Sequence, residues 1–408
     1  MRQMKIKNFG PIKNGFNDNN GYFEVKRVTI FIGDQGTGKS TVAKLFSTFS
    51  WLEKAIYRGD YENISVDDFK DLVEMQQIPC SYFVENTEIV YNGIAYNFIY
   101  KNNEFFFEKS KTFENYVRSK VMYFSAERNL LSILKNIENN NNIPNMLSVF
   151  SNRYESAKEY FETKTINLPL DNYTIELDSD KSVYVNTKES KVSLNQASSG
   201  MQSLVPIILT EKYLIETIEK DLLEKLKNVR AVTFQKSILE KIKDDELKRK
   251  VKTFFVSGIR ANFKKEELDL LQNLLKTDFN YCLTSIIEEP ELNLYPISQK
   301  NILKELISVV NQNKNNSLFI TTHSPYILGT LNNLIYAGNL TEQKIDCEKI
   351  ISNKNQISIR NISAYKIQNG DIKSIIDNEL KLIKNSEIDE CSDLINDEYA
   401  KLENIELS

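Results

Sequence analysis

The chain is poor in the residues that build metal sites and disulfide frameworks. It has 408 residues but a single histidine, His323. Its four cysteines lie far apart in the sequence, at Cys80, Cys282, Cys347 and Cys391. A structural zinc site takes about four clustered Cys or His ligands, and a disulfide framework shows paired cysteine spacings, so neither is supported. This cysteine usage is typical of the reducing cytoplasm.

Long apolar runs are also missing. No segment approaches the roughly 20 apolar residues that cross a bilayer, and residues 1–5 lead into an alternating segment instead of the apolar core of a signal peptide. We therefore expect a cytoplasmic protein without a membrane segment. The formal net charge of −4 gives no overall attraction to nucleic acids. The chain is long enough for two or three domains.

Apolar runs of strand length alternate with amphipathic helical segments. Four runs are predicted to be buried strands, at 28–32, 121–124, 281–287 and 317–322. Residues 40–51 and 297–310 carry their apolar side chains at helical spacing. Buried strands separated by helices predict an α/β fold with a mostly parallel central sheet flanked by helices.

Other segments are expected to decorate this core. Residues at about 80–110 and 168–195 alternate in polarity and predict antiparallel β elements. Residues 211–280 are rich in Lys, Glu, Leu and Ile at helical spacing and predict an inserted helical lobe. We therefore expect three parts. The head comprises residues 1–210 and 281–365, the inserted lobe residues 211–280, and a C-terminal helical segment residues 366–408.

The clearest motif is a glycine-rich loop between a predicted strand and a predicted helix. It matches GxxxxGK[ST] with the residues Gly33, Asp34, Gln35, Gly36, Thr37, Gly38, Lys39, Ser40 and Thr41. The glycines let backbone N–H groups turn towards phosphates, and the following helix N-terminus adds positive potential. Lys39 should reach the β- and γ-phosphates, and Ser40 should ligate Mg²⁺. The alternative, a glycine turn with a chance lysine, is disfavoured by the strand and helix on either side.

Two adjacent carboxylates end the predicted strand at 281–287. Glu288 is placed to hold the shell of a Mg²⁺ ion through water, and Glu289 to orient or deprotonate an attacking water. Adjacent side chains of a strand point to opposite faces, so the strand end must bend if both acids serve one site. The alternative is a solvated strand end.

A Ser-Ser-Gly turn precedes the apolar helical stretch at 204–209. Its residues Ser198, Ser199 and Gly200 offer a hydroxyl and amide groups at a helix N-terminus, which together form an anion site. An ordinary helix cap is the alternative.

The single histidine follows the predicted strand at 317–322. There His323 is suited to contact a γ-phosphate or the attacking water, and to sense whether that phosphate is present. The alternative is a buried histidine whose hydrogen bonds are satisfied by the core. Its place at the end of an ordered series of motifs favours the functional interpretation.

Together these segments resemble the ABC-type ATPase heads of the SMC/RecF/OLD (overcoming lysogenisation defect) superfamily, and most of all the stand-alone AAA family ATPases of bacterial anti-phage systems. The resemblance is carried by four segments, at 6–12, 33–41, 288–296 and 321–325. It extends over about 1–50, 120–130, 190–210 and 280–340.

The resemblance implies a role for each motif. Residues 33–41 would be Walker A, and Glu288 with Glu289 would be Walker B and the catalytic glutamate. The signature motif would comprise Ser198, Ser199, Gly200 and Gln202, the D-loop would include Glu291 and Asn293, and His323 would be the switch histidine. Residues 125–128 stand where a Q-loop is expected but lack the glutamine.

The resemblance also implies partners. Two heads would sandwich two ATP molecules with Mg²⁺, and each nucleotide would be contacted by Ser199 and Gly200 of the other copy, in a homodimer or a higher oligomer. No long heptad arms are present, and residues 324–408 leave little room for a Toprim nuclease domain, with Glu379, Asp389 and Asp393 expected on a solvated helix surface. A separate nuclease or toxin would then be the effector, in anti-phage defence.

Three alternatives remain. The chain could be a non-hydrolytic, ATP-clamped scaffold or a DNA-binding, RecF-like repair ATPase. The energising subunit of a membrane transporter is disfavoured by the long insertion and the paired glutamates. The best DNA-binding candidates are basic, namely Lys248, Arg249, Lys250, Lys252, Arg260, Lys264 and Lys265. Acidic neighbours at 244–246 dilute this charge, which favours an ordinary solvated face.

Overall fold

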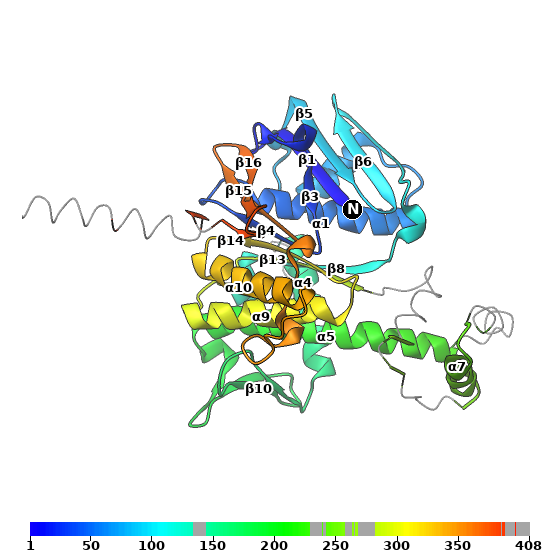
Figure 1. Ribbon diagram of the computed structural model, residues 1–408, viewed down its shortest axis with the longest axis vertical. Helices are drawn as coiled ribbons and strands as arrows, with labels where there is room; N and C mark the ends of the chain where they lie inside the picture. Colours follow the sequence, from blue (N-terminus) through cyan, green and yellow to red (C-terminus); the bar gives the residue numbers. More distant parts are fainter. Residues whose placement is uncertain are drawn as a thin grey trace, which may run out of the picture.

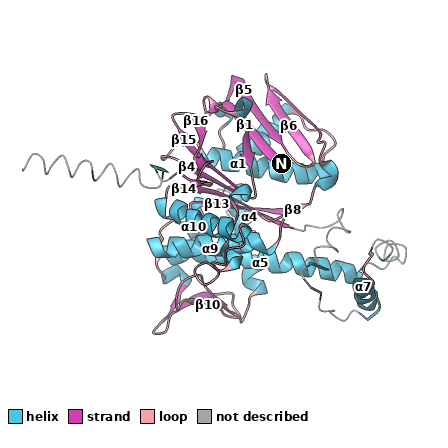
Figure 2. Ribbon diagram, viewed as in Figure 1, coloured by secondary structure: helices cyan, strands magenta, loops and turns pink. Residues whose placement is uncertain are grey.

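A computed structural model describes most of the chain, with a central sheet covered by helices and flanked by smaller sheets (Figure 1). The described residues are 1–133, 144–228, 239, 242–257, 263–264, 266–267, 282–384, 386–387 and 396. Helices and strands alternate in the α/β manner that the sequence predicts (Figure 2).

The central sheet has seven strands, in the order β2-β16-β15-β4-β14-β13-β8. Their bounds are β2 Gly15–Phe16, β16 Asp371–Ser374, β15 Ile362–Gln368, β4 Val28–Ile32, β14 Ser317–Thr322, β13 Cys282–Glu288 and β8 Ser119–Phe124. The five strands from β15 to β8 are parallel to one another. Strands β4 and β13 are buried along their whole length, which is why they read as continuous apolar runs. The expected mostly parallel sheet is confirmed.

An antiparallel sheet covers one face of the molecule. Its order is β3-β1-β5-β6-β7, with bounds β3 Phe23–Val25, β1 Arg2–Phe9, β5 Phe83–Asn92, β6 Tyr96–Lys101 and β7 Glu104–Lys109. Helix α1 (Lys39–Tyr57) lies between this sheet and the central one, and helix α2 (Val66–Glu74) packs beside it (Figure 1). Aromatic side chains fill the contact, as where Phe49 stacks on Tyr91.

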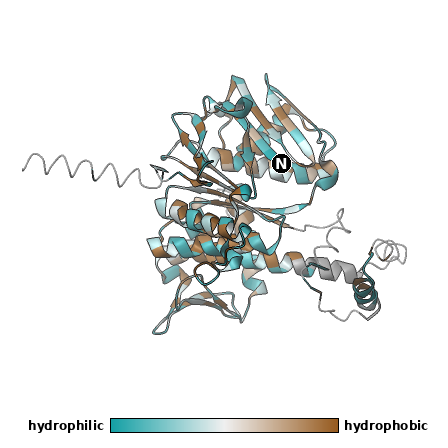
Figure 3. Cartoon of the chain, viewed as in Figure 1, coloured by the Kyte–Doolittle hydropathy of each residue, from teal (hydrophilic) through white to brown (hydrophobic). Residues whose placement is uncertain are grey.

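Helices cover the other face of the central sheet. They are α3 Leu130–Ile133, α4 Asn145–Tyr160, α5 Ser199–Asn228, α9 Pro296–Gln312 and α10 Pro325–Glu342. Apolar residues gather on the central strands and on the helix faces turned towards them (Figure 3). A second antiparallel sheet lies beyond these helices, with strands β9 Thr165–Asn167, β10 Thr174–Leu177, β11 Val183–Asn186 and β12 Lys191–Ser193. Both antiparallel elements predicted from alternation are therefore present.

The C-terminal helical segment expected at 366–408 is wrong over its first part. Residues up to 383 form strands β15 and β16 of the central sheet and the small pair β17 (Ile376–Asp377) and β18 (Leu382–Ile383). Asn369 and Gly370 both have positive φ and make the hairpin turn between β15 and β16, which is the conformation that an Asn-Gly pair favours. Glu379 lies exposed in the turn before β18, not on a helix, while Asp389 and Asp393 lie outside the described residues.

The inserted lobe begins inside a helix. Helix α5 runs without interruption through residues 210 and 211, so the expected domain boundary is not a structural break. In the lobe, α7 (Asp245–Ser257) carries most of the basic candidates, but Lys250 there is paired with Glu246 and Glu267 at 3.4 and 2.7 Å. Arg260 and Lys265 lie outside the described residues. Among the described helices, none has the length and apolarity to cross a bilayer.

Candidate functional site

The glycine loop, residues 33–38, connects the end of β4 to the start of α1. Gly33 and Gly38 have backbone φ angles of 147° and 107°, which residues other than glycine rarely adopt. A Cβ atom on Gly33 would lie 2.3 Å from the carbonyl oxygen of Ile367 on the neighbouring strand. Only glycine at this position therefore lets the loop pass so close to the backbone of β15.

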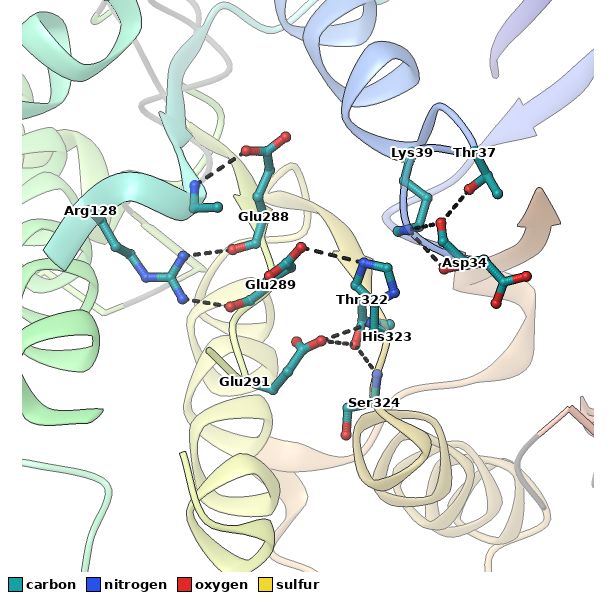
Figure 4. A network of polar contacts seen from close by, with 12 residues as sticks. Asp34, Thr37, Lys39, Arg128, Glu288, Glu289, Glu291, Thr322, His323 and Ser324 are labelled. Atoms are coloured by element: carbon teal, nitrogen blue, oxygen red, sulfur yellow. Dashed lines mark hydrogen bonds and ion pairs between the residues drawn. The ribbon is translucent and has the colours of Figure 1, made fainter. Parts of the chain in front are cut away.

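The side chain of Lys39 is folded back into the glycine loop. Its Nζ donates to the carbonyl oxygens of Gly33 and Asp34, both at 2.8 Å (Figure 4). Only 5% of Lys39 is exposed, and burial lowers the pKa of its ammonium group. Ser40, the next residue, is exposed and lines the adjoining cavity. An ammonium group and a hydroxyl thus stand at the start of α1, where the helix dipole favours an anion.

The two carboxylates that end β13 point in different directions (Figure 4). Glu288 is buried, and its Oε2 accepts a hydrogen bond from the Ala126 backbone N–H at 3.2 Å. Its Oε1 is buried and finds no hydrogen-bond partner in the described part of the chain. Glu289 has a φ of 44°, so the backbone turns sharply there and sends its carboxylate towards His323. The strand end bends as expected, but the two carboxylates do not meet at one point, since Glu288 is turned towards Ala126.

The imidazole of His323 lies against Glu289. The distance from His323 Nε2 to Glu289 Oε1 is 3.4 Å. Burial, together with the nearby Lys39 ammonium, lowers the pKa of His323, so the ring is neutral at pH 7. A neutral ring can donate from one nitrogen and accept at the other, which suits a contact between a carboxylate and a phosphate or water.

Glu291 holds the backbone of His323 in place. Its Oε1 accepts hydrogen bonds from the Thr322 hydroxyl at 2.7 Å and from the His323 N–H at 2.8 Å. Burial raises the pKa of Glu291, which means that ionisation is penalised there. The resemblance implied a D-loop role for Glu291. Its carboxylate instead bonds to the backbone of His323 in the same chain. Asn293, two residues later, is exposed.

One cavity of about 300 Å³ joins these groups. Its lining includes residues of the glycine loop, Lys39, Ser40, Glu289 and His323, together with residues 77–79 and Tyr82. The structure therefore brings together three of the four motifs found in the sequence. Nothing in the sequence marked residues 77–82 as part of a site, because the segment carries no motif.

The Ser-Ser-Gly turn does not line that cavity. Ser198 and Ser199 are exposed at the start of α5. Gly200 is buried, and a Cβ atom there would lie 2.7 Å from the carbonyl oxygen of Asn293. Gln202 is also turned inwards, since its Nε2 donates to the carbonyls of Asn195 and Ala197 at 3.1 Å each. Only the two serines face outwards.

Arg128 is a residue of the site that sequence reasoning missed. It lies in the 125–128 segment, in a short 3₁₀ turn after β8, and is fully buried. Its guanidinium donates to the backbone carbonyls of Glu288 and Glu289 (Figure 4). Its neighbours in the sequence gave no sign of burial, so the only available signal was the position of the segment after a core strand.

Comparisons with known proteins agree with this arrangement. Residues 276–328, which contain both the acidic end of β13 and His323, match the family model described as AAA ATPase domain. No curated protein sequence matches the chain.

Several solved structures are similar at low identity. The SMC head domain from Thermotoga maritima is 10% identical, with 91% of this chain and 97% of that chain covered and a TM-score of 0.36. An SmcHead bound to the C-winged helix domain of ScpA is 8% identical, with 93% and 99% covered and a TM-score of 0.42. An Smc head domain with an extended coiled coil, bound to the C-terminal domain of ScpA derived from Pyrococcus furiosus, is 8% identical. The match covers 92% of this chain and 96% of that chain, with a TM-score of 0.39. The fold assignment rests on the strand order of the central sheet.

Strand order and motifs define the class. A glycine loop follows β4, paired carboxylates end β13 two places away, and a histidine follows β14 between them, which is the arrangement of a P-loop ATPase of the ABC type. The match to the AAA ATPase domain family covers the last two of these motifs. The chain therefore has the fold and the motifs of an ABC-type ATPase head, and it resembles those of the SMC/RecF/OLD superfamily as its sequence indicated.

The Glu291 contacts lead to a first prediction. Glu291→Ala is expected to lower ATP turnover about tenfold, because His323 is then displaced and no longer aligned with Glu289 and the substrate. It should also cost about 1–3 kcal/mol of unfolding free energy, since the hydroxyl of the buried Thr322 loses its acceptor. Glu291→Gln keeps an acceptor oxygen and removes a penalised charge, so its turnover should stay within about twofold and its stability should not fall. Steady-state turnover and thermal unfolding of both variants check this, and an equal loss in both would contradict it.

Proposed function

We propose that the chain binds ATP in the cavity at the glycine loop and hydrolyses it with Glu289 as the base that activates water. In this proposal the backbone N–H groups of residues 33–41 and the Lys39 ammonium group hold the β- and γ-phosphates. His323 contacts the γ-phosphate and orients the water between that phosphate and Glu289. The proposal is supported by the 3.4 Å approach of His323 to Glu289 beside the same cavity that Lys39 and Ser40 line.

The residues present also fit Mg²⁺. The Ser40 hydroxyl is exposed at the cavity, and the buried Oε1 of Glu288 has no hydrogen-bond partner among the described residues. Hydroxyl and carboxylate oxygens are the donors that Mg²⁺ prefers, usually with waters completing the shell. Ser40 would hold the ion directly and Glu288 through water. The ion would supply charge neutralisation at the β- and γ-phosphate oxygens.

We further propose that ATP joins two copies of the chain. Ser198 and Ser199 are exposed at a helix N-terminus, outside the cavity that holds the other motifs. A helix N-terminus of this kind attracts phosphate, so the serines of each copy would contact the nucleotide in the cavity of the other. The separation of these serines from their own glycine loop is the observation on which the dimer rests.

An association experiment tests the dimer. In the Glu289→Gln background, which is expected to retain ATP, the mass in solution should rise from 47.3 kDa to twice that value when ATP and Mg²⁺ are added. Ser199→Arg, introduced into the same background, should stay at 47.3 kDa, because a long side chain at the helix tip blocks the approach of a second copy. Ser179→Arg, an exposed serine in the turn after β10, is the matched control and should associate normally. Association of both arginine variants alike would contradict the proposal.

The biological role is proposed from the resemblance. An ATPase head of this kind would regulate or power a separate effector, a nuclease or a toxin, in bacterial anti-phage defence. Turnover of the isolated chain would then be slow and stimulated by that partner.

Two other functions predict different results. A non-hydrolytic scaffold would bind ATP and associate but release no phosphate above the level of Lys39→Ala. A DNA-binding repair ATPase would show affinity for DNA that falls steeply with salt. The pairing of Lys250 with Glu246 and Glu267 weakens the basic surface on α7 and favours the first proposal over this one.

A further inference from the structure

Arg128 joins three parts of the protein at one buried point. Its Nη1 donates to the carbonyls of Ser125 at 3.1 Å and Glu288 at 2.7 Å. Its Nη2 donates to the carbonyl of Glu289 at 2.5 Å, and its Nε to the carbonyl of Ser203 on α5 at 3.0 Å. One guanidinium thereby connects the end of β13, the turn after β8 and the first turns of α5.

Every acceptor of this guanidinium is a backbone carbonyl. Burial lowers the pKa of Arg128 to about 10, which still leaves the group charged at neutral pH. No carboxylate of the described residues forms an ion pair with it, although Glu291, Glu289 and Glu288 lie near enough to favour the charge. Hydrogen bonds from a charged donor are stronger and shorter than neutral ones, and a rigid planar donor fixes the relative positions of all its acceptors.

Two of these acceptors flank the side chain of Glu289. The backbone there has a φ of 44°, a conformation that is uncommon for residues other than glycine and persists only when surrounding contacts impose it. The bonds to the carbonyls of Glu288 and Glu289 are such contacts. They hold the turn in the geometry that directs the Glu289 carboxylate to His323.

The acceptor on α5, the Ser203 carbonyl, lies one helical turn after Ser199. Helix α5 begins at Ser199, and the carbonyl of Ser203 faces Arg128. Two further contacts hold the helix start against the chain after Glu289. The Asn293 side-chain amide donates to the Ser203 hydroxyl at 3.4 Å, and Gly200 packs so closely on the Asn293 carbonyl that a Cβ atom would lie 2.7 Å from it.

We propose that Arg128 is a positioning residue for ATP hydrolysis, which couples the Glu289 turn to the N-terminus of α5. This inference rests on the proposed function, in which Glu289 activates water and the start of α5 meets the nucleotide of a second copy. A shift of α5 moves the Ser203 carbonyl, and a rigid guanidinium transmits that shift to the two carbonyls beside Glu289. When Ser198 and Ser199 contact the nucleotide held by a second copy, they therefore fix the backbone turn at Glu289 in their own copy.

Arg27 provides a matched control. Its Nη2 also donates to two backbone carbonyls, those of Val310 at 2.6 Å and Asn313 at 3.0 Å, and burial lowers its pKa as well. It lies just before β4, at the opposite end of that strand from the glycine loop. Arg27→Lys therefore removes the same kind of contact without touching the site.

The test compares Arg128→Lys with Arg27→Lys in the full chain. Lysine keeps the charge but cannot hold carbonyls in three directions through one rigid plane. At saturating ATP and Mg²⁺, single-turnover hydrolysis by Arg128→Lys should fall about 100-fold, the scale expected for a catalytic group displaced by about 1 Å. Its equilibrium affinity for ATP should change less than about threefold, because Arg128 does not line the cavity. Arg27→Lys should lose stability but hydrolyse ATP at close to the wild-type rate.

Each other outcome overturns the inference. A rate for Arg128→Lys within about threefold of wild type would show that the turn does not need the guanidinium. An equal loss of rate in Arg27→Lys would show a general effect of destabilisation, and failure of Arg128→Lys and Arg128→Gln to fold would make Arg128 a structural residue. Wild-type turnover that Lys39→Ala abolishes supports the proposed function independently, so its absence is distinguishable from failure of this inference.

Discussion

Glu289→Gln is expected to lower ATP turnover by about two to three orders of magnitude, the contribution typical of a positioned general base. Glutamine has the same shape and can keep the contact with His323, but it cannot take a proton from water. The substitution leaves the glycine loop, Lys39 and Ser40 unchanged. ATP should therefore remain bound, and the ATP-joined dimer should accumulate because the step that separates it is blocked.

The measurement is phosphate release at saturating ATP, together with the amount of nucleotide that stays with the protein. Glu342→Gln, at the end of α10 and away from the cavity, is the control and should hydrolyse ATP normally. Hydrolysis by Glu289→Gln at the wild-type rate would show that another group activates the water. Loss of ATP binding in this variant would instead place Glu289 in nucleotide binding.

Lys39→Ala is expected to abolish ATP binding at concentrations that saturate the wild-type chain, with a loss in affinity of at least about 100-fold. A loss of this size, about 3 kcal/mol, is that of a buried, charge-assisted contact whose partner charge is left unpaired. The Lys39 ammonium group is largely buried and now bonds to two carbonyls of the glycine loop, so it needs to move only a short way to reach phosphate oxygens.

Titration with a fluorescent ATP analogue and Mg²⁺ measures this loss. Lys300→Ala, an exposed lysine on α9, removes the same charge elsewhere and should leave the affinity unchanged. The thermal unfolding midpoint of Lys39→Ala should shift upwards less than that of wild type when ATP is added, because ligand stabilisation follows affinity. Undiminished binding by Lys39→Ala would contradict the assignment of the cavity.

Much of the core and of the site could be predicted from the sequence because both follow from local patterns. The apolar runs at 28–32, 281–287 and 317–322 became buried parallel strands, since a strand covered on both faces needs apolar residues throughout. The glycine loop, the paired acids and His323 each follow such a strand directly. Parallel strands place those ends at one edge of the sheet, which brings the motifs together.

What could not be predicted depends on contacts between distant segments. Arg128 is recognisable as part of the site only through bonds to Ser203 and Glu289, which lie more than seventy residues away in sequence. The positive φ of Glu289 likewise follows from tertiary contacts, not from its residue type. The error at 366–383 also depends on distant contacts, because β15 pairs with β4 and β16 pairs with β2, both near the start of the chain.

Mixing two inactive variants tests the central claim, that each ATP site is completed by a second copy, most directly. Glu289→Gln lacks the base but has an intact Ser-Ser-Gly turn, and the double variant Ser198→Ala, Ser199→Ala has the reverse defect without a long side chain that blocks association. In a mixed dimer, one site combines the intact cavity of the double-alanine variant with the intact turn of its partner. The account predicts that the equimolar mixture hydrolyses ATP at up to about a quarter of the wild-type rate, since half of random pairs are mixed and each has one complete site. A rate equal to the sum of the two separate rates would contradict it.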